Sequence, residues 1–235
     1  MSRELVLSGG ASTDGVVRVG DTVRRPPRHA NRLMRDVLVH LERVGFDAAP
    51  RRLGVDDQGR DVLTWIDGDT FTERSQMHPY IGDPPVRITF GDDQVAAAMR
   101  LLRRYHDTFA DEVVCHGDYG PWNIVWRDGL PFAVIDFDNV YRGAAADDVG
   151  YALRMFVGYG FAAAEPEELV RRTRSALAAY GADFDVPALL EREYELAEQR
   201  CRRNGWIRQL ERLEIERGWL AENRTLFGPH EAACA

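Results

Sequence analysis

Residues 116–123 read HGDYGPWN, and residues 134–138 read VIDFD. Three oxygen-bearing side chains stand in these stretches: Asp118, then Asn123 five positions later, then Asp136 thirteen positions after that. This spacing, with an apolar run just before Asp136, predicts a loop with a base and a metal ligand, followed by a hairpin with a second metal ligand. Phosphate transfer from a nucleotide requires such groups, because a carboxylate orients the attacking hydroxyl and oxygen ligands hold magnesium.

The composition is that of an ordinary globular protein, with 235 residues, 45% hydrophobic and 29% charged. No apolar run approaches the length that a membrane span needs, and the start, MSRE, has no apolar signal-peptide core. We therefore expect a cytoplasmic protein without membrane contact. The net charge of −8 argues against nucleic acid as a partner. All thirty basic residues are arginine, so any cation that binds phosphate must be a guanidinium.

The first part of the chain alternates apolar and polar residues in short segments, which is typical of strands. A Gly-rich turn and a Gly-Asp pair separate the first three of these segments, and a helical pattern follows them. Asp67-Gly68-Asp69 then interrupts the pattern, and we place the boundary between two lobes there. The predicted strands cover residues 5–7, 16–19, 22–25, 51–55 and 61–66, and the helix covers residues 30–44.

The rest of the chain is predominantly helical in its pattern. Residues 79–85 read as a loop, and Asp92 is positioned to cap a helix that runs to about Phe109. Four more helical patterns follow the two motif stretches. These cover residues 147–157, 166–180, 187–204 and 206–224.

The two motifs and this layout resemble the aminoglycoside phosphotransferase and choline-kinase-like family, which shares the protein-kinase architecture. Residues 114–118 through Asn123 look like the catalytic loop of that family, and residues 135–138 look like its metal-binding segment. Residues 147–152 look like the helix start that follows in family members.

The resemblance implies an α+β, bilobal protein-kinase-like fold. A small antiparallel-sheet lobe, residues 1–67, would bind the nucleotide, and a larger helical lobe, residues 68–235, would hold the catalytic groups and the acceptor. Asp148 would accept hydrogen bonds from the catalytic loop; an ordinary aspartate at a helix N-terminus is the alternative.

The motif residues then take separate roles. Asp118 is the candidate base for the acceptor hydroxyl, against the alternative of a turn aspartate. Asn123 and Asp136 are the candidate Mg²⁺ ligands. Asp138 either touches a second ion or hydrogen-bonds the loop. His116 belongs to the catalytic loop, where the resemblance implies an imidazole that supports the backbone rather than a second base.

The nucleotide phosphates would lie under the turn of residues 8–15. Gly9, Gly10 and Ser12 would present backbone N–H groups there, although the turn has no Walker sequence. The family's phosphate-binding lysine is absent, and Arg25 is our substitute because Val23 and Arg25 share a face of the strand. A register error of one residue would exchange Arg25 for Arg24. The family's partner glutamate on the following helix is also not evident.

The segment of residues 64–67 is the expected hinge between the lobes. Backbone groups and side chains at Trp65 and Ile66 would meet the base of the nucleotide. No motif distinguishes adenine from guanine, so ATP and GTP both remain open.

The acceptor wall would come from residues 139–235, with sixteen Asp plus Glu against thirteen Arg. The acidic residues include a group at 191, 193, 195 and 198, which we expect mostly to face solvent. Tyr151 and Tyr194 are among the aromatic residues that would form core or pocket. This near balance of charge does not select a polycationic acceptor.

The leading prediction is a Mg²⁺-dependent enzyme that moves the γ-phosphate of ATP or GTP to a hydroxyl of a small molecule. The partners would then be a nucleotide and a small hydroxylated substrate, either an aminoglycoside-like antibiotic or a metabolite. The alternative is a catalytically impaired relative that binds nucleotide or ligand as a regulatory or immunity module. The three motif residues favour the enzyme, and the missing lysine and glutamate favour the binder.

Overall fold

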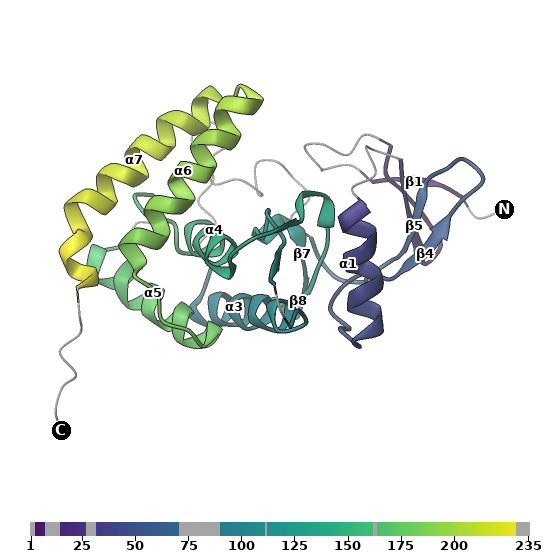
Figure 1. Ribbon diagram of the computed structural model, residues 1–235, viewed down its shortest axis with the longest axis horizontal. Coiled ribbons are helices and arrows are strands. Elements are labelled where there is room, and N and C mark those ends of the chain that lie inside the picture. The colour runs from purple at the N-terminus through teal and green to yellow at the C-terminus, as the bar shows by residue number, and fades with distance from the viewer. Residues whose placement is uncertain are drawn as a thin grey trace.

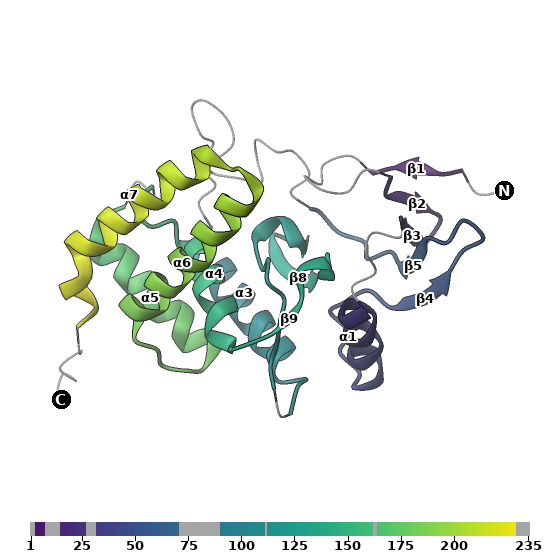
Figure 2. The ribbon, with the colours of Figure 1, turned by 45° about the horizontal axis from the view of Figure 1, so that its top comes forward.

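The computed structural model describes residues 3–7, 15–26, 32–70, 90–110, 112–161 and 164–228. Figures 1 and 2 show a small sheet with one helix at one end of the molecule and a group of helices at the other. None of the helices in these ranges is long and apolar enough to cross a bilayer. The expected loop at residues 79–85 lies outside the described residues.

The small sheet is antiparallel and has the strand order β1-β2-β3-β5-β4. Its first three strands form the predicted meander, and helix α1 follows them in the chain. The apolar side chains Met34, Val37, Leu38 and Leu41 recur at helical spacing in α1 and are buried. The elements are β1 Leu5–Val6, β2 Val17–Val19, β3 Thr22–Arg25, α1 Arg32–Arg43, β4 Arg52–Val55 and β5 Asp61–Thr64.

A connector leaves β5 and joins the second part of the molecule through backbone pairing. Asp69 and Trp126 exchange backbone hydrogen bonds of 2.9 and 2.8 Å. Gly68, just before this pair, has φ +145°, and a Cβ there would lie 2.6 Å from the carbonyl oxygen of Trp126. The close approach of the two backbones therefore requires a glycine.

Within the described residues, five long helices and two short two-stranded sheets form the second part, and Figures 1 and 2 show how they lie together. The predicted helices are confirmed, with small shifts at their ends. The helices are α3 Asp92–His106, α4 Ala145–Val157, α5 Pro166–Tyr180, α6 Val186–Asn204 and α7 Ile207–Asn223. The strand pairs are β6 Val114–Cys115 with β9 Tyr141–Arg142, and β7 Ile124–Arg127 with β8 Leu130–Val134, with short 3₁₀ turns at Pro121–Asn123, Phe137–Asn139 and Arg224–Phe227.

Two expectations about single residues were wrong. Asp92 does not cap α3, because Gly91 holds the cap position and Asp92 instead pairs with Arg171 and Arg172 of α5. Glu193 does not face solvent: only 1% of its side chain is exposed, because α6 packs that face against α4 and α7.

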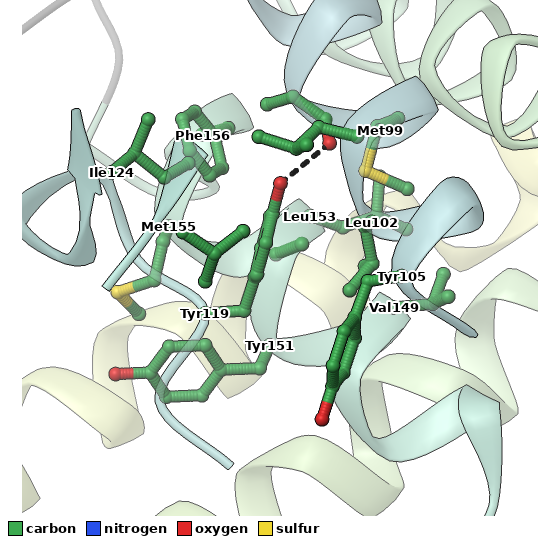
Figure 3. Packing of buried hydrophobic residues seen from close by; sticks show 14 of the residues in the cluster. Met99, Leu102, Tyr105, Tyr119, Ile124, Val149, Tyr151, Leu153, Met155 and Phe156 are labelled. Atoms are coloured by element: carbon green, nitrogen blue, oxygen red, sulfur yellow. Dashed lines mark hydrogen bonds between the residues drawn. The ribbon is translucent and has the colours of Figure 1, made fainter. Parts of the chain in front are cut away.

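The core of the second part surrounds the motif loop, residues 116–123. Tyr119 is fully buried, and its hydroxyl donates to the carbonyl oxygen of Ala98 in α3 over 2.8 Å (Figure 3). Met99, Leu102 and Phe156 pack in the same cluster (Figure 3). The loop that holds Asp118 is therefore fixed on a rigid core.

Cys115 provides a test of this packing. Its side chain is fully buried, its Sγ donates to the carbonyl oxygen of Ala144, and burial raises its pKa to about 12. With that pKa of about 12, only about 1 in 10⁴ molecules has the reactive thiolate at about pH 8. We expect iodoacetamide to leave Cys115 unmodified in the native protein and to modify it in urea, as peptide mass spectrometry would report. Rapid modification of the native protein would contradict this packing.

Candidate active site

The motif loop is held by a buried carboxylate behind it. Asp148 of α4 accepts the backbone N–H of His116 over 2.6 Å and that of Gly117 over 2.9 Å, and it also contacts His106 Nε2 at 3.1 Å. Gly117 has φ +75°, and a Cβ there would lie 2.3 Å from the carbonyl oxygen of Asn139. The first turn of α4 and a glycine thus set the course of the loop.

His116 joins the two motif stretches. Its imidazole is fully buried, and Nε2 donates to the carbonyl oxygen of Ile135 over 3.0 Å. Ile135 in turn donates its backbone N–H to the carbonyl oxygen of Asn123. In this position the imidazole supports the backbone between Asp118 and Asp136.

Asp118 is surrounded by hydrogen-bond donors on both carboxylate oxygens. Tyr151 donates its hydroxyl to Oδ1 over 2.5 Å, and Asn123 Nδ2 donates to Oδ2 over 2.9 Å. Trp122 Nε1 lies 3.5 Å from Oδ2. Burial raises the pKa of Asp118 above its usual 3.8, while the hydrogen bond from Tyr151 opposes that rise. Asp118 is therefore positioned as a hydrogen-bond acceptor with a basicity increased by desolvation.

Asn123 lies at the end of the 3₁₀ turn that follows the loop. Its Nδ2 donates to both the backbone oxygen and Oδ2 of Asp118, so its amide oxygen is the atom that can bind a cation. The same residue thus orients the candidate base and presents an oxygen ligand.

Asp136 and Asp138 converge on one cation. Arg25 Nη2 lies 2.8 Å from Asp136 Oδ1 and 2.7 Å from Asp138 Oδ2. Asp136 adopts φ +65°, a left-handed conformation that is uncommon for a residue with a side chain and that occurs often at functional sites. Burial lowers the pKa of Arg25, but the two carboxylates outweigh that effect and raise it.

These contacts also test whether magnesium fits the site. The guanidinium of Arg25 is a stand-in cation between two carboxylates, and the donors are hard oxygen atoms of the kind that Mg²⁺ prefers. The described residues contain no group of three or more His, Cys, Asp or Glu side chains arranged around a metal. The oxygen atoms that could hold magnesium are the Asn123 amide oxygen and the carboxylates of Asp136 and Asp138.

The remaining predicted residues lie in the first lobe. Trp65 Nε1 donates to Asp67 Oδ1, and Arg18 lies over the Trp65 ring at 4.1 Å from its centroid. The backbone N–H of Trp65 donates to the carbonyl oxygen of Asp21, so this group is already used within the sheet. Ile66 is half-buried against the core. Gly9, Gly10 and Ser12 lie outside the described residues.

Two features were missed by the sequence analysis. Tyr151 contacts the candidate base, and its only local signal is its place three residues after Asp148, which brings both side chains to one face of α4. The resemblance implies a basic residue on the sheet and a glutamate on the following helix. Here the charges of the pair are reversed: Arg35 of α1 pairs with Asp61 of β5 at 3.0 Å. Arg52 also binds Asp61, so this buried carboxylate ties α1 to two strands.

Comparison with known proteins agrees with this geometry. Residues 86–190, which include the loop of residues 116–123, the segment of residues 134–138 and α4, match the model of the phosphotransferase enzyme family. The predicted family resemblance is thereby confirmed. A curated relative, the trifolitoxin immunity protein of Rhizobium leguminosarum bv. trifolii, is 32% identical over 161 residues. That match covers 59% of this chain and only 56% of the relative, so little more than half of the relative's length is represented.

Solved structures of phosphotransferases share the fold. The apoenzyme of macrolide 2'-phosphotransferase MphH from Brachybacterium faecium aligns with a TM-score of 0.52 at 13% identity, over 92% of this chain and 88% of that one. A spectinomycin phosphotransferase in complex with ADP and spectinomycin aligns with a TM-score of 0.51, also at 13% identity and with the same coverage. The predicted α+β, protein-kinase-like fold is therefore confirmed. At this level of identity the likeness is one of fold alone.

Proposed function

We propose that this protein transfers the γ-phosphate of ATP or GTP to a hydroxyl of a small molecule, with Mg²⁺ as the cofactor. The observation that supports the proposal most directly is a pair of contacts made by side chains of the two motif stretches. Asn123 contacts Asp118, and Asp136 joins Asp138 around one cation. The match of residues 86–190 to the phosphotransferase enzyme family supports the same chemistry.

In this proposal each group has one task. Asp118 accepts the proton of the acceptor hydroxyl as its oxygen attacks the γ-phosphorus. Asn123, Asp136 and Asp138 would hold Mg²⁺, which would neutralise charge on the phosphates. Arg25 lies beside the same carboxylates and is placed to pair with phosphate oxygens through its planar fork.

A second candidate function has two observations in its favour. The curated relative is named an immunity protein, and Arg25 occupies the carboxylates that would hold the metal. A module that binds a nucleotide or toxin-like ligand without transferring phosphate fits both observations. The two candidates differ in whether any acceptor gains phosphate.

The deciding experiment incubates the protein with Mg-ATP or Mg-GTP and a panel of hydroxylated metabolites and antibiotics. Mass spectrometry should find an acceptor that gains one phosphate, and the gain should vanish with Asp118→Ala. Binding of Mg-nucleotide in a thermal-shift assay with no transfer to any acceptor would favour the binding module. No thermal shift with either nucleotide would contradict both the transferase and a module that binds nucleotide.

Arg25 gives a separate prediction at this site. Arg25→Ala removes the internal counter-ion of Asp136 and Asp138, so we expect Mn²⁺ to bind more tightly without nucleotide, as titration calorimetry would measure. We also expect Mg-nucleotide to bind about 10-fold more weakly or worse, because charge-assisted hydrogen bonds to phosphate are lost. Arg24→Ala is the matched control, since Arg24 contacts Thr22 and Asp56 instead. Equal effects of the two variants would mean that Arg25 has no special role.

A further inference from the structure

The candidate base already binds a hydroxyl from within the chain. Tyr151 donates to Asp118 Oδ1 over 2.5 Å, and only 8% of the tyrosine is exposed. The other carboxylate oxygen, Oδ2, receives the N–H donors of Asn123 and Trp122. Oδ1 is therefore the oxygen that meets an O–H group, which is the kind of donor an alcohol acceptor would bring.

Tyr151 is held in this position by the packing of α4 against α6. The preceding residue is Gly150, where a Cβ would lie 3.1 Å from the carbonyl oxygen of Leu189 and 3.2 Å from Glu193 Cβ. The absence of a side chain at Gly150 lets the two helices approach closely. Figure 3 shows the Tyr151 hydroxyl directed away from Tyr105 and Val149.

A cation supports the ring from the other helix. The guanidinium of Arg200 lies over the Tyr151 ring at 5.0 Å from its centroid, and Arg200 Nη2 binds Glu193 Oε1 at 2.7 Å. Glu193 is buried and also contacts Arg154 of α4. The tyrosine ring thus contacts a buried ionic network. Helix packing and this contact together position its hydroxyl against Asp118.

We propose that the Tyr151 hydroxyl occupies the place of the acceptor hydroxyl on Asp118 and keeps water away from that oxygen until an alcohol displaces it. This inference rests on the proposed function. With Tyr151 in place, water has to compete with the tyrosine hydroxyl for Asp118 Oδ1, so hydrolysis of the nucleotide is slowed. When an alcohol binds, its O–H takes over Oδ1, its oxygen forms the new bond to phosphorus, the nucleoside diphosphate leaves, and Asp118 holds the proton. Tyr151 is in this sense a specificity-determining residue that favours alcohols over water.

The test measures phosphate release from Mg-ATP and Mg-GTP without any acceptor. Tyr151→Phe keeps the ring and its contact with Arg200 but frees Oδ1 for water, and we expect hydrolysis to rise about 10-fold, the equivalent of one hydrogen bond. Tyr159→Phe is the matched control: Tyr159 is also buried in the same part of the molecule, and its hydroxyl contacts Thr173 instead. We expect its hydrolysis to stay at the level of the unchanged protein.

The added hydrolysis should disappear in the double variant Tyr151→Phe, Asp118→Asn. General damage to the fold lowers hydrolysis, so a rise separates the proposed role from a merely structural one. Should Tyr151→Phe fail to fold, Arg200→Met loosens the ring while keeping the hydroxyl, and we expect a smaller rise.

Three results would overturn the inference. The first is hydrolysis by Tyr151→Phe and Arg200→Met that is no faster than in the unchanged protein, while thermal shift still reports Mg-nucleotide binding. The second is phosphate on Tyr151 itself, found by mass spectrometry, because the tyrosine would then be an acceptor. The third is the absence of any Mg-nucleotide binding by the unchanged protein, which would also remove the proposed function and is distinguished by that binding assay.

Discussion

Replacing Asp118 with asparagine is expected to slow phosphate transfer by about 10²–10⁴-fold, the usual contribution of a positioned base. Asparagine keeps the shape of the side chain and can still accept the hydroxyl of Tyr151 through its oxygen. It cannot take the proton of the acceptor. We therefore expect Mg-nucleotide affinity to change little, and the loss to fall on the turnover number rather than on the KM of the nucleotide.

The matched comparison is Asp136→Asn. This change removes one charge from the pair that binds Arg25 Nη2 and, in the proposal, from the metal site. We expect it to weaken Mg-nucleotide binding much more than Asp118→Asn does, as titration calorimetry would measure. Equal losses of binding in the two variants would refute the separate roles of base and metal ligand.

Arg154→Met should be the most damaging change to stability outside the site. Arg154 Nε binds Glu216 of α7 at 2.6 Å, and its Nη1 lies 3.3 Å from Glu193 of α6. Only 1% of each glutamate side chain is exposed. Methionine fills similar space but removes the guanidinium that contacts both buried carboxylates, while Arg200 still binds Glu193. The expected loss is about 3–5 kcal/mol in the free energy of unfolding, measured by urea denaturation.

The pH dependence of this loss can be derived from Glu193. Burial raises the pKa of Glu193 above its usual 4.5, and removing Arg154 should raise it further. A carboxyl whose pKa is raised in the folded state binds its proton more tightly there, so its contribution to stability is lost as pH rises through that pKa. The deficit of Arg154→Met should therefore be larger at about pH 8 than at about pH 5.

Arg202→Met is the control for this prediction. Arg202 pairs with Glu198 on the surface, where 69% of the arginine side chain is exposed. A pair of this kind contributes about 0–1 kcal/mol, so the control should be nearly as stable as the unchanged protein. An Arg154 variant that resembled this control at both pH values would show that the buried network is not required for stability.

Element boundaries were predicted well wherever the signals were local. The helix expected over residues 166–180 is α5 with the same ends, because Pro166 suits the first turn and Gly181 follows the last residue. The first three strands formed the expected meander, since glycine turns separate runs of two-residue period. Asp92 was misassigned because a capping aspartate and an aspartate in the first helical turn look alike in sequence.

Charge partners were predicted poorly because they depend on contacts between distant segments. Glu193 lies in an acidic run that reads as a solvated helix face, yet two other helices cover it. Asp61 opens a strand, and nothing near it in the sequence indicates that Arg35 and Arg52 will bind it. The pattern of a single helix shows which residues share a face, but it does not show what covers that face.

Local sequence was sufficient for the order of the elements and for selecting Asp118, Asn123 and Asp136 as candidates, because periodicity and turn chemistry act over a few residues. Folding in three dimensions decided that Arg25 reaches Asp136 across 111 positions and that Tyr151 reaches Asp118 across 33. These contacts arise from the packing of strands and helices that are remote in the chain, and only the close approach of their backbones brings such side chains together.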